Sequence, residues 1–277
     1  MILHLEQVSF TYPSNPIFYN LSLEIRAGEF LSILGPNGSG KSTLLKLMSR
    51  ILEPDAGKIE LQSIPLPRYS RRRLSQLIGY VPQDSSWLFP FSVQEVVLMG
   101  RTPHVRSFGF DRENDLDIAR ESMKRVNILE LADKAVTAIS GGERQRALIA
   151  RALAQQPRIL LLDEPNAHLD IAHQLEVFEI LRNENDERNL TIICVSHDIN
   201  LASAFSKSIL LLAPLGGAMA PLGSIAALGI PSAVLTRSTL SKVFDAPIIV
   251  DTHPTAGTPR VSLEVKKQYP LVHGVGK

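Results

Sequence analysis

The sequence has little of three things: cysteine, net charge and uninterrupted hydrophobic length. Its single cysteine, Cys194, excludes a disulfide within the chain and suits a reducing compartment. Because Cys194 lies in the apolar run "TIICVSHD", we interpret it as a small buried hydrophobe. With 29 Lys and Arg against 28 Asp and Glu, the net charge of +1 offers no electrostatic basis for binding nucleic acid or an acidic membrane surface. The 277 residues can form one large domain or two small ones.

A membrane segment is not expected either. The start, "MILHLEQVSFTY", alternates apolar and polar residues and lacks a basic region followed by an apolar one, so we expect no signal peptide. The uncharged stretch 208–236 is long enough to span a membrane. It is interrupted by Pro214, Gly216, Gly217, Pro221, Gly223, Gly229 and Pro231. An interior proline costs a helix about 3 kcal/mol and an interior glycine about 1 kcal/mol. We therefore predict two short strands that turn at Gly216 and Gly217, followed by a loop.

Strand and helix patterns alternate along most of the chain, which is typical of a mainly parallel sheet. Strand patterns cover residues 2–10, 21–25, 29–35, 57–61, 77–83, 158–165 and 190–198. Helical patterns cover residues 41–51, 93–99, 115–126, 142–154, 169–187 and 199–206. We predict an α/β fold with an N-terminal antiparallel β part, a mainly parallel core sheet and a helical subdomain inserted at about residues 84–155. The tail, residues 251–277, contains a possible strand, "VSLEV", and has no assigned role.

A glycine-rich stretch predicts a phosphate-binding loop. "GPNGSGKST", residues 35–43, has the form G-x-x-x-x-G-K-[ST] and lies between a predicted strand and a predicted helix. Its glycines let backbone N–H groups point at phosphates, and the helix N-terminus adds positive potential. Lys41 can reach the β and γ phosphates of a nucleotide, and the Ser42 hydroxyl can ligate Mg²⁺. The predicted cradle comprises Gly35, Pro36, Asn37, Gly38, Ser39, Gly40, Lys41, Ser42 and Thr43. The alternative is a glycine-rich turn that carries a lysine by chance.

An acidic pair can supply the Mg²⁺ ligand and the general base that a phosphate-binding loop does not itself contain. In "ILLLDE", residues 159–164, Asp163 ends an apolar strand, where its carboxylate can hold the Mg²⁺ shell. Glu164 can orient or deprotonate a water for attack on the γ-phosphate. The alternative is an acidic turn after a strand, without chemistry.

A second glycine turn, in "ISGGERQRALIARAL" at residues 139–153, opens a basic helix rich in Ala and Leu. With Ser140-Gly141-Gly142-Glu143 in the place of a signature motif, the chain resembles the ATP-binding cassette ATPases over about residues 1–245. The resemblance implies an ABC ATPase domain over residues 1–250 and a homodimer with two ATP molecules at its interface. In such a dimer Ser140, Gly141 and Gly142 face the γ-phosphate held by the other chain, where a helix N-terminus provides an anion site. An ordinary capped helix is the alternative.

The same resemblance assigns four further residues. It implies that Tyr12 stacks on adenine, that Gln83 touches Mg²⁺ and the attacking water, and that His197 contacts the γ-phosphate. Asp170 is implied to lie at the dimer interface. A strand-end tyrosine and a structural histidine are the alternatives for Tyr12 and His197.

Two residues depart from the family's pattern. Ile139 stands where leucine is commoner, which we expect to be harmless. Asn166 stands where threonine or serine is commoner, so the loop before Asp170 departs from the family's pattern. We interpret His168 and His173 as surface or interface residues without chemistry.

Resemblance to one sub-family indicates which transport process is coupled to ATP hydrolysis. "FSVQEVVLMGRTPH", residues 91–104, and "VLTRSTLSKVFDAPIIV", residues 234–250, resemble the importers of iron–siderophore complexes, haem and cobalamin. The resemblance implies two copies of this chain, two integral-membrane permease chains and an extracytoplasmic substrate-binding protein. It implies a peripheral position at the cytoplasmic face of the inner membrane. No nucleic-acid partner is expected, because the net charge is only +1. A soluble ABC ATPase of the iron–sulfur assembly type and the ATPase subunit of an exporter are the alternatives. The sequence does not identify the cargo.

The segment 85–104 is the expected contact with the permease, because the family docks the permease's coupling helix there. Trp87, Leu88, Phe89 and Phe91 give it an apolar surface, and exposed apolar patches often mark partner surfaces. The alternative is that these side chains fill the core of the helical insertion.

Overall fold

The computed structural model describes the chain apart from residues 14, 84–88, 106–111, 214–223 and 265–277. At its centre is a six-stranded sheet in the order β10-β9-β3-β8-β7-β6. Neighbouring strands are parallel except for the antiparallel edge pair β9 and β10. The strands are β3 (Phe30–Leu34), β6 (Ile78–Val81), β7 (Ile159–Asp163), β8 (Thr191–Val195), β9 (Ser208–Leu212) and β10 (Ile225–Gly229). The predicted mainly parallel core sheet is confirmed.

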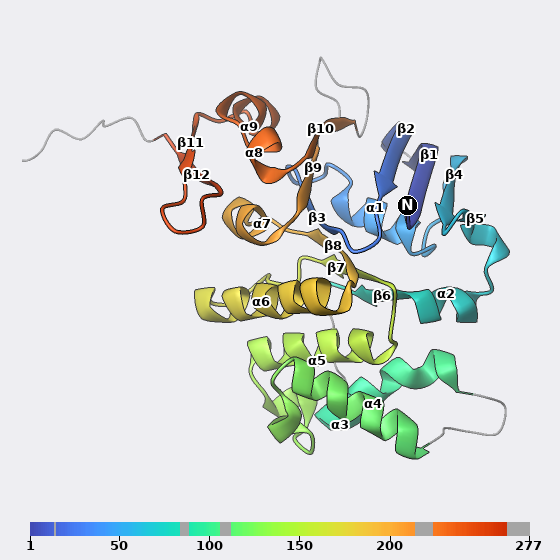
Figure 1. The fold of residues 1–277 in the computed structure, drawn as a ribbon. Coiled ribbons are helices and arrows are strands. Elements are labelled where there is room, and N and C mark those ends of the chain that lie inside the picture. Colours follow the sequence, from blue (N-terminus) through green and yellow to red (C-terminus); the bar gives the residue numbers. More distant parts are fainter. Residues whose placement is uncertain (14, 84–88, 106–111, 214–223, 265–277) are drawn as a thin grey trace, which may run out of the picture.

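A four-stranded antiparallel sheet in the order β2-β1-β4-β5 stands beside it (Figure 1). Its strands are β1 (Leu3–Tyr12), β2 (Asn15–Ile25), β4 (Ala56–Leu61) and β5 (Ile64–Pro65). In β2, Leu21, Leu23 and Ile25 are buried while the residues between them are exposed, so one face packs on the core and the other faces water. The expected N-terminal antiparallel part is confirmed, and it runs longer in both strands than the period-two pattern predicted.

The central strands are buried on both faces, which explains their unbroken apolar sequences. In β7, Ile159 and Leu161 pack on one face with helix α1 (Lys41–Met48) and the N-terminal sheet. Leu160 and Leu162 pack on the other face with α5 (Gly141–Ala154) and α6 (Ile171–Arg188). The lone thiol, Cys194, lies fully buried on this second face, as predicted. Helices α1 and α5 therefore lie on opposite faces of the sheet.

The helices between β6 and β7 gather at one end of the molecule (green in Figure 1). They are α3 (Val93–Leu98), η2 (Met99–His104), α4 (Arg112–Arg125), η3 (Leu129–Leu131), η4 (Val136–Ala138) and α5. Helices α3, α4 and α5 pack on one another around a shared apolar core. This arrangement is the helical part expected of the fold, although its limits at residues 84 and 155 remain predictions. Helix α4 begins three residues earlier than the predicted start at Asp115.

Short elements link the N-terminal sheet to β6. After β5 come η1 (Leu66–Arg68) and helix α2 (Arg71–Leu77). The side chain of Ser70 caps α2 by accepting a hydrogen bond from the Arg73 N–H. Sequence reasoning missed α2 because it is short and carries only two buried residues, Leu74 and Leu77.

The C-terminal part partly matches the prediction for the uncharged stretch 208–236. Strands β9 and β10 pair antiparallel as predicted, while their proposed turn lies outside the described residues. The predicted loop after them is wrong in part, because helix α8 (Pro231–Val234) lies within it; helix α9 (Arg237–Phe244) follows beyond the stretch. No helix among the described residues has the length and apolar character to cross a membrane.

A final hairpin packs on helix α7 (Ile199–Phe205). It consists of β11 (Ile248–Thr252) and β12 (Pro259–Leu263), so the possible tail strand is present. The Asn200 side chain accepts a hydrogen bond from the Val261 N–H at 2.8 Å and donates one to the Val261 carbonyl at 3.2 Å. The Ser203 hydroxyl donates to the Pro259 carbonyl at 2.6 Å. The hairpin is thereby tied to the helix that follows His197.

Candidate functional site

The glycine-rich loop joins β3 to α1, with its backbone shaped for a concave turn. Gly40 at the helix N-cap has φ of +92°, and a Cβ there would come within 2.7 Å of the Phe18 ring, so only glycine fits. No side chain caps α1, which leaves its first N–H groups available to an anion. Ser39 is buried at 1% exposure, and its hydroxyl has no hydrogen-bond partner among the described residues. The uncapped start of α1 and the unpaired Ser39 hydroxyl suit phosphate oxygens.

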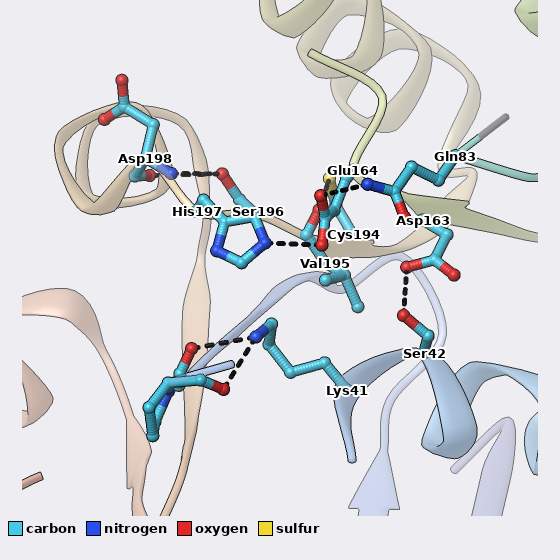
Figure 2. A network of polar contacts seen from close by, with 12 residues as sticks. Lys41, Ser42, Gln83, Asp163, Glu164, Cys194, Val195, Ser196, His197 and Asp198 are labelled. Atoms are coloured by element: carbon cyan, nitrogen blue, oxygen red, sulfur yellow. Dashed lines mark hydrogen bonds and ion pairs between the residues drawn. The ribbon is translucent and has the colours of Figure 1, made fainter. Parts of the chain in front are cut away.

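Lys41 supplies the positive charge of this loop. Its Nζ donates to the carbonyls of Gly35 at 2.9 Å and Pro36 at 3.1 Å (Figure 2). Burial lowers the pKa of Lys41, although the nearby carboxylates of Glu164 and Asp163 act in the opposite direction. The ammonium group thus lies over the loop, bonded to neutral carbonyls that an anionic ligand can replace.

Asp163 lies at the C-terminal end of β7, facing the start of α1. The Ser42 hydroxyl donates to its Oδ1 at 2.8 Å, and the Tyr80 hydroxyl donates to its Oδ2 at 3.3 Å. Burial raises the pKa of Asp163 above the ordinary value, while the hydrogen bond from Ser42 opposes this shift. The predicted oxygen pair of Ser42 and Asp163 is therefore brought together across 121 positions of sequence.

Glu164 lies between two predicted partners, as Figure 2 shows. Gln83 donates from Nε2 to Oε2 at 2.8 Å, and Nε2 of His197 lies 2.5 Å from Oε1. Since an ionised carboxylate only accepts, the proton of that second contact is carried by His197 Nε2. Glu164 has φ of +52°, a left-handed conformation that costs a non-glycine residue of order 1–3 kcal/mol and is concentrated at active sites. The strained backbone aims this carboxylate at the space beside the phosphate loop.

Tyr12 lies at the end of β1, next to the loop. Its hydroxyl is 3.5 Å from the Thr43 hydroxyl, and its ring contacts the Phe10 ring edge-on at 4.9 Å between centroids. The ring is half-buried, so part of its surface remains available beside α1. This position agrees with a contact to a base whose phosphates lie on the loop, and that role stays a prediction.

The second glycine turn lies away from this cluster, at the N-terminus of α5. Ser140 caps α5 by accepting from the Glu143 N–H at 3.2 Å, and the Glu143 carboxylate accepts from the Ser140 N–H at 2.7 Å. Asp170 caps α6 and accepts from both the backbone and the ring of His173. Those two hydrogen bonds lower the pKa of Asp170. The predicted residues therefore form two groups, one at α1 and one at the N-termini of α5 and α6.

Sequence reasoning overlooked two residues of these groups. Tyr80 contacts Asp163 because β6 lies parallel to β7, with Tyr80 opposite Leu161, and no local sequence pattern indicates this register. Burial and the Asp163 carboxylate raise the pKa of Tyr80, which therefore stays a neutral donor. His173, interpreted as having no chemistry, packs against Gly142.

Comparison with known proteins identifies the family. Residues 18–167 match the sequence model of the family described as "ABC transporter". The chain belongs to the ABC transporter family. As an ATP-binding subunit of this family, it is an ATPase coupled to transport, and its ligand is ATP.

Relatives within the ABC transporter family match over most of their length. The ferric enterobactin transport ATP-binding protein FepC of Escherichia coli K12 is 36% identical over 256 residues, 92% of either chain. The hemin import ATP-binding protein HmuV of Vibrio cholerae is 36% identical, over 91% of this chain and 94% of its own. A solved structure described as an inward-facing conformation of a putative metal-chelate type ABC transporter matches with a TM-score of 0.81 and 32% identity. That match covers 96% of this chain and 98% of the other.

Proposed function

We propose that this chain is the ATP-hydrolysing subunit of a binding-protein-dependent importer of metal chelates. The observation that carries this proposal is the Glu164 carboxylate, held between Gln83 and His197 beside the pair of Ser42 and Asp163. The named relatives transport ferric enterobactin and hemin. An iron–siderophore complex, haem or cobalamin is accordingly the cargo class that we infer for the complete transporter.

We assign one role in ATP hydrolysis to each residue around Glu164 and the phosphate loop. Lys41 exchanges its loop carbonyls for the β and γ phosphates of ATP. Glu164 acts as general base, taking a proton from the water that attacks the γ-phosphate. His197 contacts Glu164 through Nε2 before ATP binds, and we infer that this N–H turns to a γ-phosphate oxygen when ATP is bound, while Gln83 orients the water from the other side. Bound in this way, the reacting atoms need no further alignment before attack.

The oxygen pair beside Glu164 fits a Mg²⁺ ion. Ser42 Oγ and Asp163 Oδ1 lie 2.8 Å apart. Neighbouring oxygens of an octahedral Mg²⁺ shell are separated by roughly 2.9 Å, since the metal–oxygen bonds are about 2.0–2.1 Å. We assign Ser42, Asp163 and Gln83 to this ion. Mg²⁺ supplies charge neutralisation at the phosphates when it is bound.

A second copy of the chain is needed because the two anion-binding turns do not face one nucleotide. Helix α1 packs on one face of the sheet and α5 on the other. We infer a dimer with two ATP molecules at its interface, in which Ser140, Gly141 and Gly142 contact the γ-phosphate on the partner's loop. Asp170 lies at the same interface. ATP binding closes the dimer, and hydrolysis with phosphate release reopens it.

A groove of about 630 Å³ is our candidate site for the permease. It lies between the end of α1, α2, β6, η2 and α5. Its lining combines the exposed apolar side chains of Ile51 and Met99 with Arg71 and Arg72. This combination suits an amphipathic helix that carries acidic residues. Tyr80 also lines the groove and donates to Asp163, so a docked helix adjoins the nucleotide site.

The aromatic segment before α3 is a second candidate contact for the permease. Trp87 and Leu88 lie outside the described residues, while Phe89 is 64% exposed. The exposure of Phe89 favours a partner surface over a place in the core of the helical part. The complete assembly that we propose contains two copies of this chain and two permease chains. It receives cargo from an extracytoplasmic binding protein and places this chain at the cytoplasmic face of the membrane.

The experiment that tests this function is uptake in cells whose only copy carries Glu164→Gln. Labelled cobalamin, haem and several iron–siderophores form the panel, with wild type and Glu187→Gln, a change on the exposed side of α6, as controls. Loss of one cargo with Glu164→Gln alone supports the importer and names its substrate. No loss for any cargo contradicts the importer and leaves the soluble and exporter alternatives.

A further inference from the structure

The N-terminal turns of α5 and α6 touch at one point. A Cβ added to Gly142 would lie 2.2 Å from Cδ2 and 2.7 Å from Cγ of His173, so the imidazole ring lies directly against the Gly142 Cα. Gly142 is buried within helix α5 and does not have a left-handed backbone. A side chain at residue 142 would have to displace this ring, so glycine permits the close approach that His173 makes.

The other edge of the same ring is held by Asp170. Nδ1 of His173 lies 2.8 Å from Asp170 Oδ1, and the His173 N–H donates to the same oxygen at 2.9 Å. Because the carboxylate accepts, Nδ1 carries a proton, and this fixes the plane of the ring. The ring is about one-third exposed, and the Asp170 side chain is mostly exposed. The imidazole therefore bridges a buried glycine of one turn and an exposed carboxylate of the next.

Neighbouring contacts prevent the two turns from moving apart. One helical turn further along, Arg146 of α5 forms an ion pair with Glu176 of α6. The Gln174 side chain folds back and donates to the Leu169 carbonyl at 2.9 Å, which holds the loop before Asp170. His173 is the member of this set that contacts the glycine turn itself.

We propose that His173 is a positioning residue of the dimer interface, setting the distance between the turn Ser140–Gly142 and Asp170. The inference rests on the proposed ATP-bound dimer, in which both features face the partner's nucleotide. The His173 ring acts as a spacer, so that the turn Ser140–Gly142 and Asp170 move together when they meet the partner chain. Its hydrogen bonds among the described residues go to Asp170, and not to Glu164, Gln83 or the phosphate loop of its own chain, so we expect it to leave nucleotide binding there unchanged.

Measuring the dimer dissociation constant distinguishes a role of His173 at the interface from a general contribution to the stability of the chain. In a Glu164→Gln background with ATP and Mg²⁺, we expect His173→Ala to raise the dimer dissociation constant about tenfold or more, since a charge-assisted hydrogen bond and a packed ring are lost. The affinity of the monomer for a fluorescent ATP analogue should stay within about twofold of the parent, because that site belongs to Lys41 and Ser42. His173→Asn, which keeps an N–H donor for Asp170, should recover part of the loss.

The control is His4→Ala, which removes a partly exposed imidazole from β1, on the other sheet. Dimer affinity that is unchanged by His173→Ala overturns the inference. An equal loss of dimer affinity and of monomer ATP affinity also overturns it, because the effect is then general. If the Glu164→Gln parent itself stays monomeric, the dimer of the proposed function fails, and the contact is still tested by the following cycle.

A double-mutant cycle measures the contact without reference to the dimer. Gly142→Ala should lower the melting temperature of the nucleotide-free chain, because its Cβ meets the His173 ring. In a His173→Ala background the same change should raise the melting temperature, since the ring is gone and alanine favours a helix over glycine. This reversal of sign supports the spacer. Additive effects of the two changes contradict it.

Discussion

A buried ion pair in the helical part allows a quantitative test of its packing. Arg101 and Asp115 are each 4% exposed, and Arg101 Nε donates to Asp115 Oδ1 at 2.8 Å. Arg101 also donates to the Ala154 carbonyl at 2.7 Å, at the end of α5. Removing one partner of a buried pair typically costs about 3–5 kcal/mol. Because Asp115→Ala leaves Arg101 its carbonyl partner, we expect a loss of about 3 kcal/mol, a large share of the 5–15 kcal/mol typical of a domain.

Urea unfolding followed by circular dichroism measures this loss. Asp117→Ala, on the exposed side of the same helix, is the matched control and should change stability by less than about 0.5 kcal/mol. The double change Arg101→Met with Asp115→Leu should recover most of the loss, because apolar replacement of a whole buried pair is often neutral. A loss below about 1 kcal/mol for Asp115→Ala refutes the reasoning, since a buried guanidinium without its carboxylate partner would then cost almost nothing.

Two further predictions concern the nucleotide site. Tyr80→Phe removes a 3.3 Å hydrogen bond to Asp163, so the KM for Mg-ATP should rise several-fold while the circular dichroism spectrum stays unchanged; an unaltered KM contradicts a role for this contact. Asp163→Asn should raise the melting temperature of the nucleotide-free chain at pH 7.5. Burial raises the pKa of Asp163, so the folded state binds the proton more tightly than the unfolded state, and the carboxylate destabilises the fold as pH rises through that pKa. The advantage of asparagine should vanish toward the ordinary pKa of 3.8; a lower melting temperature at pH 7.5 contradicts the sign.

Much of the candidate nucleotide site could be proposed from the sequence because its residues occur at the ends of strongly patterned elements. The apolar runs before Gly35 and before Asp163 predicted buried parallel strands, and the carboxyl ends of such strands meet at one edge of a sheet. That edge brings Gln83, Glu164 and His197 together, although 33 positions separate the last two. Local patterns identified each residue, and the parallel sheet explains why they converge.

Predictions were weakest where the elements are short or their burial is one-sided. Helix α8 falls in a stretch whose prolines and glycines favoured strand and loop, yet Val234 anchors it in a core beside β9, and Leu240 anchors the following helix α9 in the same core. Tertiary burial outweighs local propensity in such segments. Helix boundaries elsewhere differ from the predicted ones by one to three residues; α5, for example, begins at Gly141, directly after its capping residue Ser140.

The sequence by itself determined the ATPase chemistry, because a phosphate loop, an acidic strand end and a second glycine turn each depend on residues adjacent in the chain. Only the tertiary structure decided which side chains meet across elements. Tyr80 reaches Asp163 through the parallel register of β6 and β7, and His173 reaches Gly142 through the packing of α6 on α5. Contacts of this kind are set by the relative placement of whole elements. The placement of these elements depends on all the apolar contacts of the core together, so a local sequence pattern cannot predict it.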